Sequence, residues 1–301
     1  MNSTEINIDS WIIPVDILVA VLSGLCVTLV MLFLVVIVVD KTCHTIPMIL
    51  VANSYLAALL FGSVFFSTVL FALENDLKMI EYQDSLCVFR GYISYAACTI
   101  LMYSFSLQAI YRFVTVIYPS RLFWQSTRAQ LLLISITWIF GTVSPLVFSL
   151  NGQIIYNVDN QTCQLTLQLS FWIFYMAQCV YIIPVSLIVF LYFKLIRYIK
   201  EMSTRVTPLN TLPRAQRELK MIRRIVILVM ILIMSCLPYG IFIIMSFFDK
   251  TPKYHFRIAA LVGSVTLAST CVALFQFTDP LKASVMKRIN GRKNMVVPTV
   301  A

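Results

Sequence analysis

Charged residues are scarce in this chain and are missing altogether from long parts of it. Only 12% of the 301 residues are Asp, Glu, Lys or Arg, whereas 60% are hydrophobic. A soluble domain carries roughly a quarter charged residues. The mean hydropathy of +0.88 is too high for a soluble globular chain, so we expect a membrane protein.

The residues on which enzymes and metal sites depend are also sparse. The chain has 2 histidines, His44 and His255, in segments expected at opposite membrane faces. The sequence contains no cluster of metal ligands, no nucleophile beside a base and no glycine-rich phosphate loop. We therefore expect no enzymatic activity, no metal site and no cofactor.

What the chain does have is seven uncharged runs, each at least twenty residues long. A helix needs about 20 apolar residues to cross a bilayer, and inside lipid its backbone must satisfy its own hydrogen bonds. A β-barrel would instead show alternating segments of about 10 residues. The sequence therefore predicts an all-α bundle of seven transmembrane helices. The runs cover residues 17–39, 46–73, 91–111, 129–150, 165–193, 225–248 and 258–278.

Basic residues are distributed unevenly between the two ends of these runs. Lys and Arg near helix ends stay in the cytoplasm, which favours an extracellular N-terminus. The net charge of +10 then belongs to the inner face, and favours anionic lipids and acidic cytoplasmic partners over nucleic acid. Asp16 and Asp76 are among the acids expected outside. The outer cations are Lys78, Arg90, Lys250, Lys253 and Arg257.

Two glycosylation sequons fall in segments that this orientation places outside. They begin at Asn2 and Asn160, and both residues are predicted to carry glycans, although sequons this short also arise by chance. No basic segment or cleavage site precedes the first run, so we expect that helix to be an uncleaved anchor.

Eight cysteines divide by position. Six lie within the predicted helices or on the cytoplasmic side, as small buried hydrophobes do. Cys87 and Cys163 lie outside, in an oxidising compartment that favours a disulfide between them. The alternative is a pair of free thiols.

These features together resemble the rhodopsin-like (class A) G-protein-coupled receptors. The family keeps a fixed interval between a cysteine at the outer start of helix three and the arginine of an Asp-Arg-Tyr motif. Here Cys87 and Arg112 are 25 residues apart, or about 37 Å of helix, and the motif reads Tyr111-Arg112-Phe113. Other positions match the family's tryptophan, prolines, tyrosine and helix-six and helix-seven motifs: Trp138, Pro145, Pro184, Tyr192, Ser235-Cys236-Leu237-Pro238 and Asp279-Pro280.

The resemblance implies an activation switch. Prolines weaken the helices where they lie, and Arg112 would pair with Glu218 at rest and meet Tyr192 after helix six swings outward. The alternative is that Glu218 is a solvated loop charge. Tyr111 replaces the motif's acid, and Cys236 replaces the tryptophan of helix six. Asp279 is a further candidate as an intramembrane acid. The predicted switch residues are Tyr111, Arg112, Pro184, Tyr192, Glu218, Cys236, Pro238, Asp279 and Pro280.

The resemblance also limits the ligand. Amine receptors of the family carry an acid where this chain has Ser94, and opsins carry a helix-seven lysine where it has Ala273. We therefore expect a neutral small molecule or the end of a peptide, although several of these side chains could equally pack the bundle. The predicted pocket comprises Ser94, Tyr95, Cys98, Met176, Val180, Tyr239, Ile243 and Ser269, with Cys236 beside them.

The expected organisation is an extracellular N-terminus (1–16), a receptor domain (17–280) and a short amphipathic eighth helix with a basic tail (281–301). The expected function is ligand-driven activation of a heterotrimeric G protein at the plasma membrane, with membrane lipids as further partners. A channel or transporter would need polar residues along a path through the core. Asp279 is the only charged residue expected within the helices. A signalling-dead scaffold with the receptor fold is the other alternative.

Overall fold

The computed structural model describes residues 9–168, 170–205, 227, 230–231, 233–234 and 237–289. Three predicted site residues, Asn2, Glu218 and Cys236, lie outside this part of the chain.

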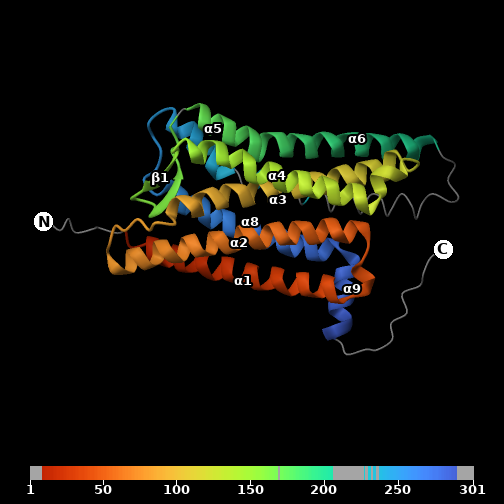
Figure 1. Ribbon diagram of the computed structural model, residues 1–301, viewed down its shortest axis with the longest axis horizontal. Coiled ribbons are helices and arrows are strands. Elements are labelled where there is room, and N and C mark those ends of the chain that lie inside the picture. The colour runs from red at the N-terminus through yellow and green to blue at the C-terminus, as the bar shows by residue number, and fades with distance from the viewer. Residues whose placement is uncertain are drawn as a thin grey trace, which may run out of the picture.

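Long helices run side by side along the molecule (Figure 1). Within the described ranges, six are long and apolar enough to span a membrane, and a shorter apolar helix covers Leu237–Ser246. This confirms the predicted seven-helix bundle. The six are α1 (Ile12–Val39), α2 (Ile46–Lys78), α3 (Cys87–Ile117), α4 (Thr127–Leu150), the span Phe171–Tyr198 and α8 (His255–Phe277).

The fifth span is built from three consecutive helical segments, α5 (Phe171–Met176), the π-helical turn η3 (Ala177–Ile182) and α6 (Ile183–Arg205). Its predicted start at residue 165 was wrong. Residues 162–165 form a strand instead, and the helix begins after Ser170, whose hydroxyl accepts from the Ile173 amide at 3.4 Å. Apolar strand and helix residues read alike in sequence, because periodicity alone does not separate them.

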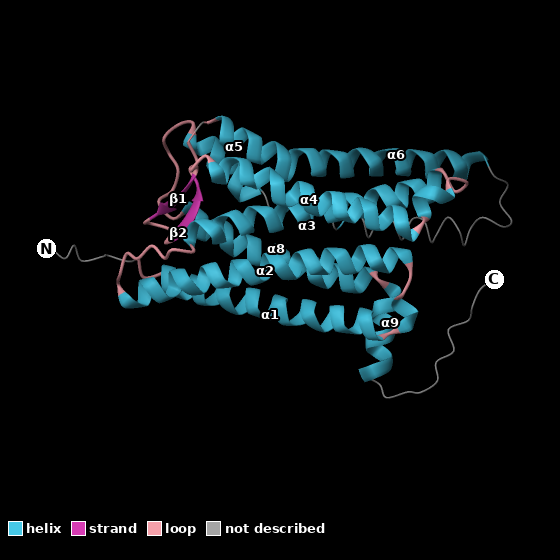
Figure 2. Cartoon of the chain, in the orientation of Figure 1, coloured by secondary structure: helices cyan, strands magenta, loops and turns pink. Residues whose placement is uncertain are grey.

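A two-stranded hairpin covers one end of the bundle (Figure 2). It consists of β1 (Ile154–Asn157) and β2 (Thr162–Leu165), paired antiparallel with Tyr156 opposite Cys163. All four residues of β2 are buried. The hairpin lies at the same end as the start of α1, which is the outer end of the predicted topology.

The interior of the bundle joins α1, α2, α3 and α8 through one apolar cluster around Tyr55, Ile100 and Cys271. Two hydrogen bonds between polar side chains cross from one helix to another. The Trp138 indole donates to Asn53 Oδ1 at 2.8 Å, and Gln108 donates to Ser54 Oγ at 2.6 Å. Apolar side chains elsewhere on these helices are exposed, as contact with lipid requires.

Two short 3₁₀ turns, η1 (Lys41–Cys43) and η2 (Leu122–Gln125), join the helices at the inner end. There α9 (Asp279–Ile289) turns away from α8, as the predicted eighth helix (Figure 1). The Asp40 carboxylate accepts from Ser284 of α9 and from the Thr42 amide. These hydrogen bonds hold the pKa of Asp40 below its usual value, and the one from Ser284 has the largest effect. They also join α9 to the first inner loop.

Gly141 sets how closely α4 approaches α3. A Cβ atom at this position would lie 2.4 Å from Ile100 Cγ1 and 3.2 Å from the Ile100 amide nitrogen. Small residues allow such close approach between membrane helices, so Gly141 is required by packing and not by backbone conformation.

We expect Gly141→Ala to destabilise the folded protein by about 1–3 kcal/mol, because it overpacks this contact. The measurement is thermal unfolding of the purified protein in detergent. Gly263→Ala in α8 is the control, since a Cβ there meets no atom within 4 Å. Equal unfolding temperatures for the two variants would contradict the packing argument.

Candidate functional site

The disulfide between Cys87 and Cys163 joins the hairpin to the outer start of α3, with the two Cα atoms 5.4 Å apart. The predicted pair is confirmed. Gly91, one turn further along α3, lies directly under the strand, because a Cβ there would be 2.6 Å from the Cys163 carbonyl oxygen. The hairpin is therefore held tightly over α3.

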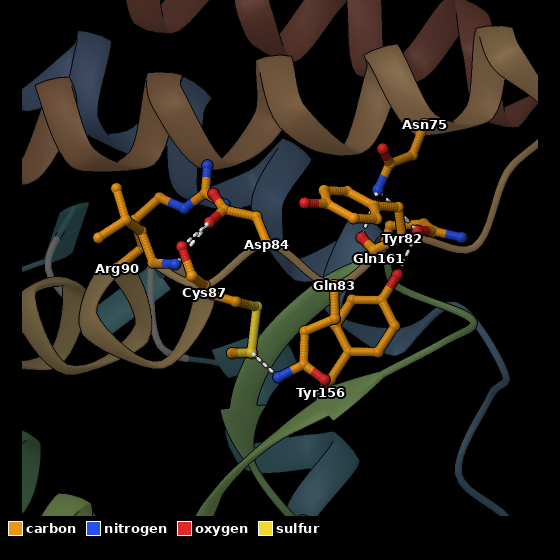
Figure 3. Close-up of a disulfide and its surroundings, with 11 residues drawn as sticks. Asn75, Tyr82, Gln83, Asp84, Cys87, Arg90, Tyr156 and Gln161 are labelled. Carbon is orange, nitrogen blue, oxygen red and sulfur yellow. Dashed lines mark hydrogen bonds and ion pairs between the residues drawn. A yellow bond between two sulfur atoms is a disulfide. The ribbon is translucent and has the colours of Figure 1, made fainter.

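Hydrogen bonds fix the same hairpin to α2 (Figure 3). The Asn75 amide donates to Gln161 Oε1 at 3.1 Å and to the Tyr82 carbonyl at 3.0 Å. The Tyr156 hydroxyl donates to the same Gln161 oxygen. Burial raises the pKa of Tyr156, which keeps its hydroxyl protonated as a donor. The hairpin of residues 154–165, which we call the lid, is thus anchored on two helices by covalent and polar contacts.

Asn160 lies at the turn of the hairpin and is 1% exposed. Its Nδ2 donates to Asn157 Oδ1 at 2.9 Å and to the Lys253 carbonyl at 3.4 Å, and its Oδ1 accepts from the Phe256 amide. A glycan would attach to that buried Nδ2 atom, so these contacts argue against modification at Asn160, which stays a prediction. The sequon residue instead ties the hairpin to the start of α8.

Three charged side chains form a buried cluster close to the outer ends of α1, α2 and α8. Arg257 donates through Nη1 to both Asp16 and Asp76, and through Nη2 to Asp76 Oδ1 at 3.1 Å. Their side chains are only 4 to 7% exposed. One guanidinium therefore joins three helices that are distant in sequence.

All three residues were expected in outer segments. The expectation that Asp279 is the only charged residue in the helices was wrong. The helices extend further than the uncharged runs, with α1 beginning at Ile12. The apolar residues before Asp16, from Trp11 to Val15, were the signal that the helix continues past the acid.

Predicted switch residues gather at the inner halves of α3 and α6. Arg112 and Tyr111 are half-buried near the inner end of α3. Tyr192 of α6 lies close enough to Arg112 to interact with it electrostatically. Higher up, the Ser106 hydroxyl of α3 donates to the carbonyl oxygen of buried Pro184 at 3.4 Å. α3 and α6 are therefore in contact at the predicted hinge, and the two predicted switch residues lie within electrostatic range of each other.

The helix-seven motif lies elsewhere than expected. α8 ends at Phe277, and Asp279 and Pro280 form the exposed first turn of α9. Asp279 is therefore not an acid inside the bundle, because the chain leaves the seventh span before reaching it. Pro238 is half-buried in the Leu237–Ser246 helix.

Six of the predicted pocket residues share one apolar cluster beneath the lid. It contains Leu165 and Leu167 from the lid region, and the Tyr95 hydroxyl accepts from the Leu165 amide at 3.1 Å. Ser94 is half-buried on α3, and the Ser269 hydroxyl donates to the Val265 carbonyl within α8; neither serine belongs to the cluster. The six residues are Tyr95, Cys98, Met176, Val180, Tyr239 and Ile243.

The comparison with family models gives one finding that matches this arrangement. A family described as 7 transmembrane receptor (rhodopsin family) matches residues 30–275. No curated protein matches the chain.

We expect Arg257→Met to destabilise the fold by about 3–5 kcal/mol, because it leaves two buried carboxylates without a counter-charge. Asp16→Asn should cost less, since Arg257 keeps its two-point contact with Asp76. Thermal unfolding in detergent measures both effects. Lys78→Met is the control, because the Lys78 side chain is 59% exposed, and an Arg257→Met variant as stable as this control would refute the structural role of the cluster.

Removal of N-linked glycans by an endoglycosidase tests the predicted glycan at Asn160. We expect the mobility shift on treatment to be the same for wild type and Asn160→Gln, because the Nδ2 atom is buried and hydrogen-bonded in the fold. Asn2→Gln is the comparison variant, and we predict that it loses the shift. A smaller shift for Asn160→Gln than for wild type would show that the residue is modified.

Proposed function

The chain belongs to the rhodopsin family of seven-transmembrane receptors, and we propose that it converts the binding of an extracellular ligand into activation of a heterotrimeric G protein. As a multi-pass protein with a disulfide-bonded outer lid, it would act at the plasma membrane, with inner-leaflet lipids beside the basic α9.

The observation that carries this proposal is the continuity of α3. Its outer end is tied to the lid by Cys87, and its inner end carries Arg112, which lies within electrostatic range of Tyr192. One unbroken helix of 31 residues thus connects the surface that meets ligand with the surface that would meet the G protein. A displacement at the lid can be transmitted along it as a rigid element.

The fifth span supplies a second moving part. Its helix changes from α to π at Ala177–Ile182, directly before Pro184. π-helical turns weaken the regular hydrogen-bond pattern and are frequent at functional sites, and Pro184 removes a further donor. We infer that α6 can tilt below this point, so that Tyr192 moves relative to Arg112.

For the ligand we propose a neutral small molecule or the end of a peptide, bound above the cluster that contains Tyr95, Met176 and Tyr239. The cluster is apolar with a few hydroxyls, which suits such a ligand. Ser94 offers no carboxylate for an amine, and α8 contains no lysine for retinal.

At the inner face, we propose that Glu218 holds Arg112 at rest. A buried arginine is costly unless it is paired, and Tyr111 cannot supply the charge that the family's acid supplies. Breaking this pair would release α3 and the sixth helix toward the active arrangement.

Recruitment of a panel of G proteins without ligand tests this function, with surface expression matched between variants. We expect Glu218→Ala to raise basal recruitment about fivefold or more, as typical coupling energies allow. Arg112→Ala should reduce recruitment to background, and Tyr192→Phe should reduce it partly.

The matched control is Arg121→Ala, an exposed cation of the neighbouring inner loop, which should leave recruitment unchanged. If Glu218→Ala expresses well and recruits no more G protein than wild type, the latch is wrong. Recruitment that persists in Arg112→Ala would exclude Arg112 as the coupling residue, and recruitment by none of these variants would favour a signalling-dead scaffold.

A further inference from the structure

A separate cavity of about 300 Å³ lies outside the lid, between the hairpin and the segment that leads into α8. This volume is at the lower end of the range for small-molecule sites, which begins at about 300 Å³. None of its lining residues belongs to the ligand pocket predicted in the bundle. Its polar lining includes Asn157, Asp159, Gln164, Ser246, Lys253 and His255.

Two opposite charges stand at the rim of this cavity. Lys253 Nζ lies 3.3 Å from Asp159 Oδ1, and both side chains are substantially exposed, at 61% and 43%. The hydrogen bond with Asp159 raises the pKa of Lys253, so the lysine is fully charged at neutral pH. The rim therefore offers one cation and one anion, side by side and accessible.

The hydrogen bonds of His255 determine what the wall of the cavity offers. His255 Nδ1 lies 3.1 Å from the Pro252 carbonyl, which can only accept, so this nitrogen carries the proton. His255 Nε2 then accepts from Gln164 Nε2 at 3.1 Å. Within the described chain this leaves Gln164 Oε1 buried without a hydrogen-bond partner. Gln164 is only 4% exposed, so Gln164 and His255 form a closed wall, and the charges that a ligand can reach lie at the rim.

These features define the chemistry of a ligand. The lining carries equal positive and negative charge, so a ligand of net charge would leave one charge unbalanced. An apolar ligand would bury the polar wall without partners. In a free α-amino acid, one carbon carries both the ammonium and the carboxylate. These two groups can meet the rim pair to form four charges of alternating sign, each beside an opposite charge.

We propose that this outer cavity binds a small zwitterion of the free α-amino acid class. Its carboxylate contacts Lys253 Nζ, and its ammonium contacts the Asp159 carboxylate. The site is additional to the pocket in the bundle, and its occupancy does not depend on the G-protein coupling proposed above.

Binding is tested on the purified full-length receptor in lipid nanodiscs without a G protein. The probes are the twenty free amino acids, each screened by thermal shift up to about 10 mM, a concentration that detects even weak sites. For the tightest binder, we expect Lys253→Gln and Asp159→Asn each to weaken affinity about tenfold or more, because each removes a charge-assisted hydrogen bond. The N-acetyl amide of the same amino acid, which lacks both charges, should bind correspondingly weakly.

The chain supplies a matched control pair. Lys78 and Glu74 form an exposed ion pair on α2, with Nζ and Oε1 2.5 Å apart and side chains 59% and 60% exposed. Neither residue lines the cavity. Lys78→Gln and Glu74→Gln change the same charges by the same amounts, and should leave the affinity unchanged.

Three results would overturn the proposal: no binding by any of the amino acids, an affinity unaffected by both rim variants, or equal binding of the uncharged analogue. Since the assay contains no G protein, its outcome is independent of coupling. Binding with the expected variant pattern in a receptor that recruits no G protein would retain this site and refute the proposed signalling. The reverse pattern would refute only the site.

Discussion

Lipid around the helices is the constraint from which the rest of this structure follows. Because hydrocarbon offers no hydrogen-bond partners, each spanning segment must be helical and each polar group inside must be paired. The contacts of Trp138 with Asn53 and of Gln108 with Ser54 meet this requirement across helices. The same constraint explains why the charges of Asp16, Asp76 and Arg257 are paired with one another and lie near the outer helix ends, where burying charge costs less than at the bilayer centre.

At the outer end of the bundle, a disulfide and several hydrogen bonds hold the hairpin on the helices. The disulfide holds the hairpin on α3, Gln161 holds it on α2, and Asn160 holds it on the start of α8. A lid anchored on three helices is stiff, so a ligand that shifts it must move the helices themselves. α3 is the element best suited to carry such a movement inward, because it runs without interruption from the disulfide to Arg112.

Much of the fold was predictable, because length and the absence of charge alone identify helices that can cross a bilayer. The outer location of Cys87 and Cys163 was enough to pair them. The errors occurred where polarity and position compete. Asp279 was expected inside the seventh helix and lies on the exposed start of α9. At Asn160 the sequon, a local pattern that contains no information about burial, predicts a glycan, whereas the structure places the side-chain amide in hydrogen bonds to Asn157 and Lys253.

The sequence by itself determined the membrane class, the number of spans and the disulfide, and it predicts the orientation of the spans, since each depends on composition or on which side of the bilayer a residue falls. Only the tertiary structure decided which residues far apart in the chain meet. Arg257 had to be brought to Asp16 and Asp76 before three apparent surface charges became a buried cluster. Likewise, the hairpin had to fold back onto α8 before Gln164 and His255 could form the wall of a cavity. Both arrangements arise from long-range packing, which local hydropathy and motif spacing do not encode.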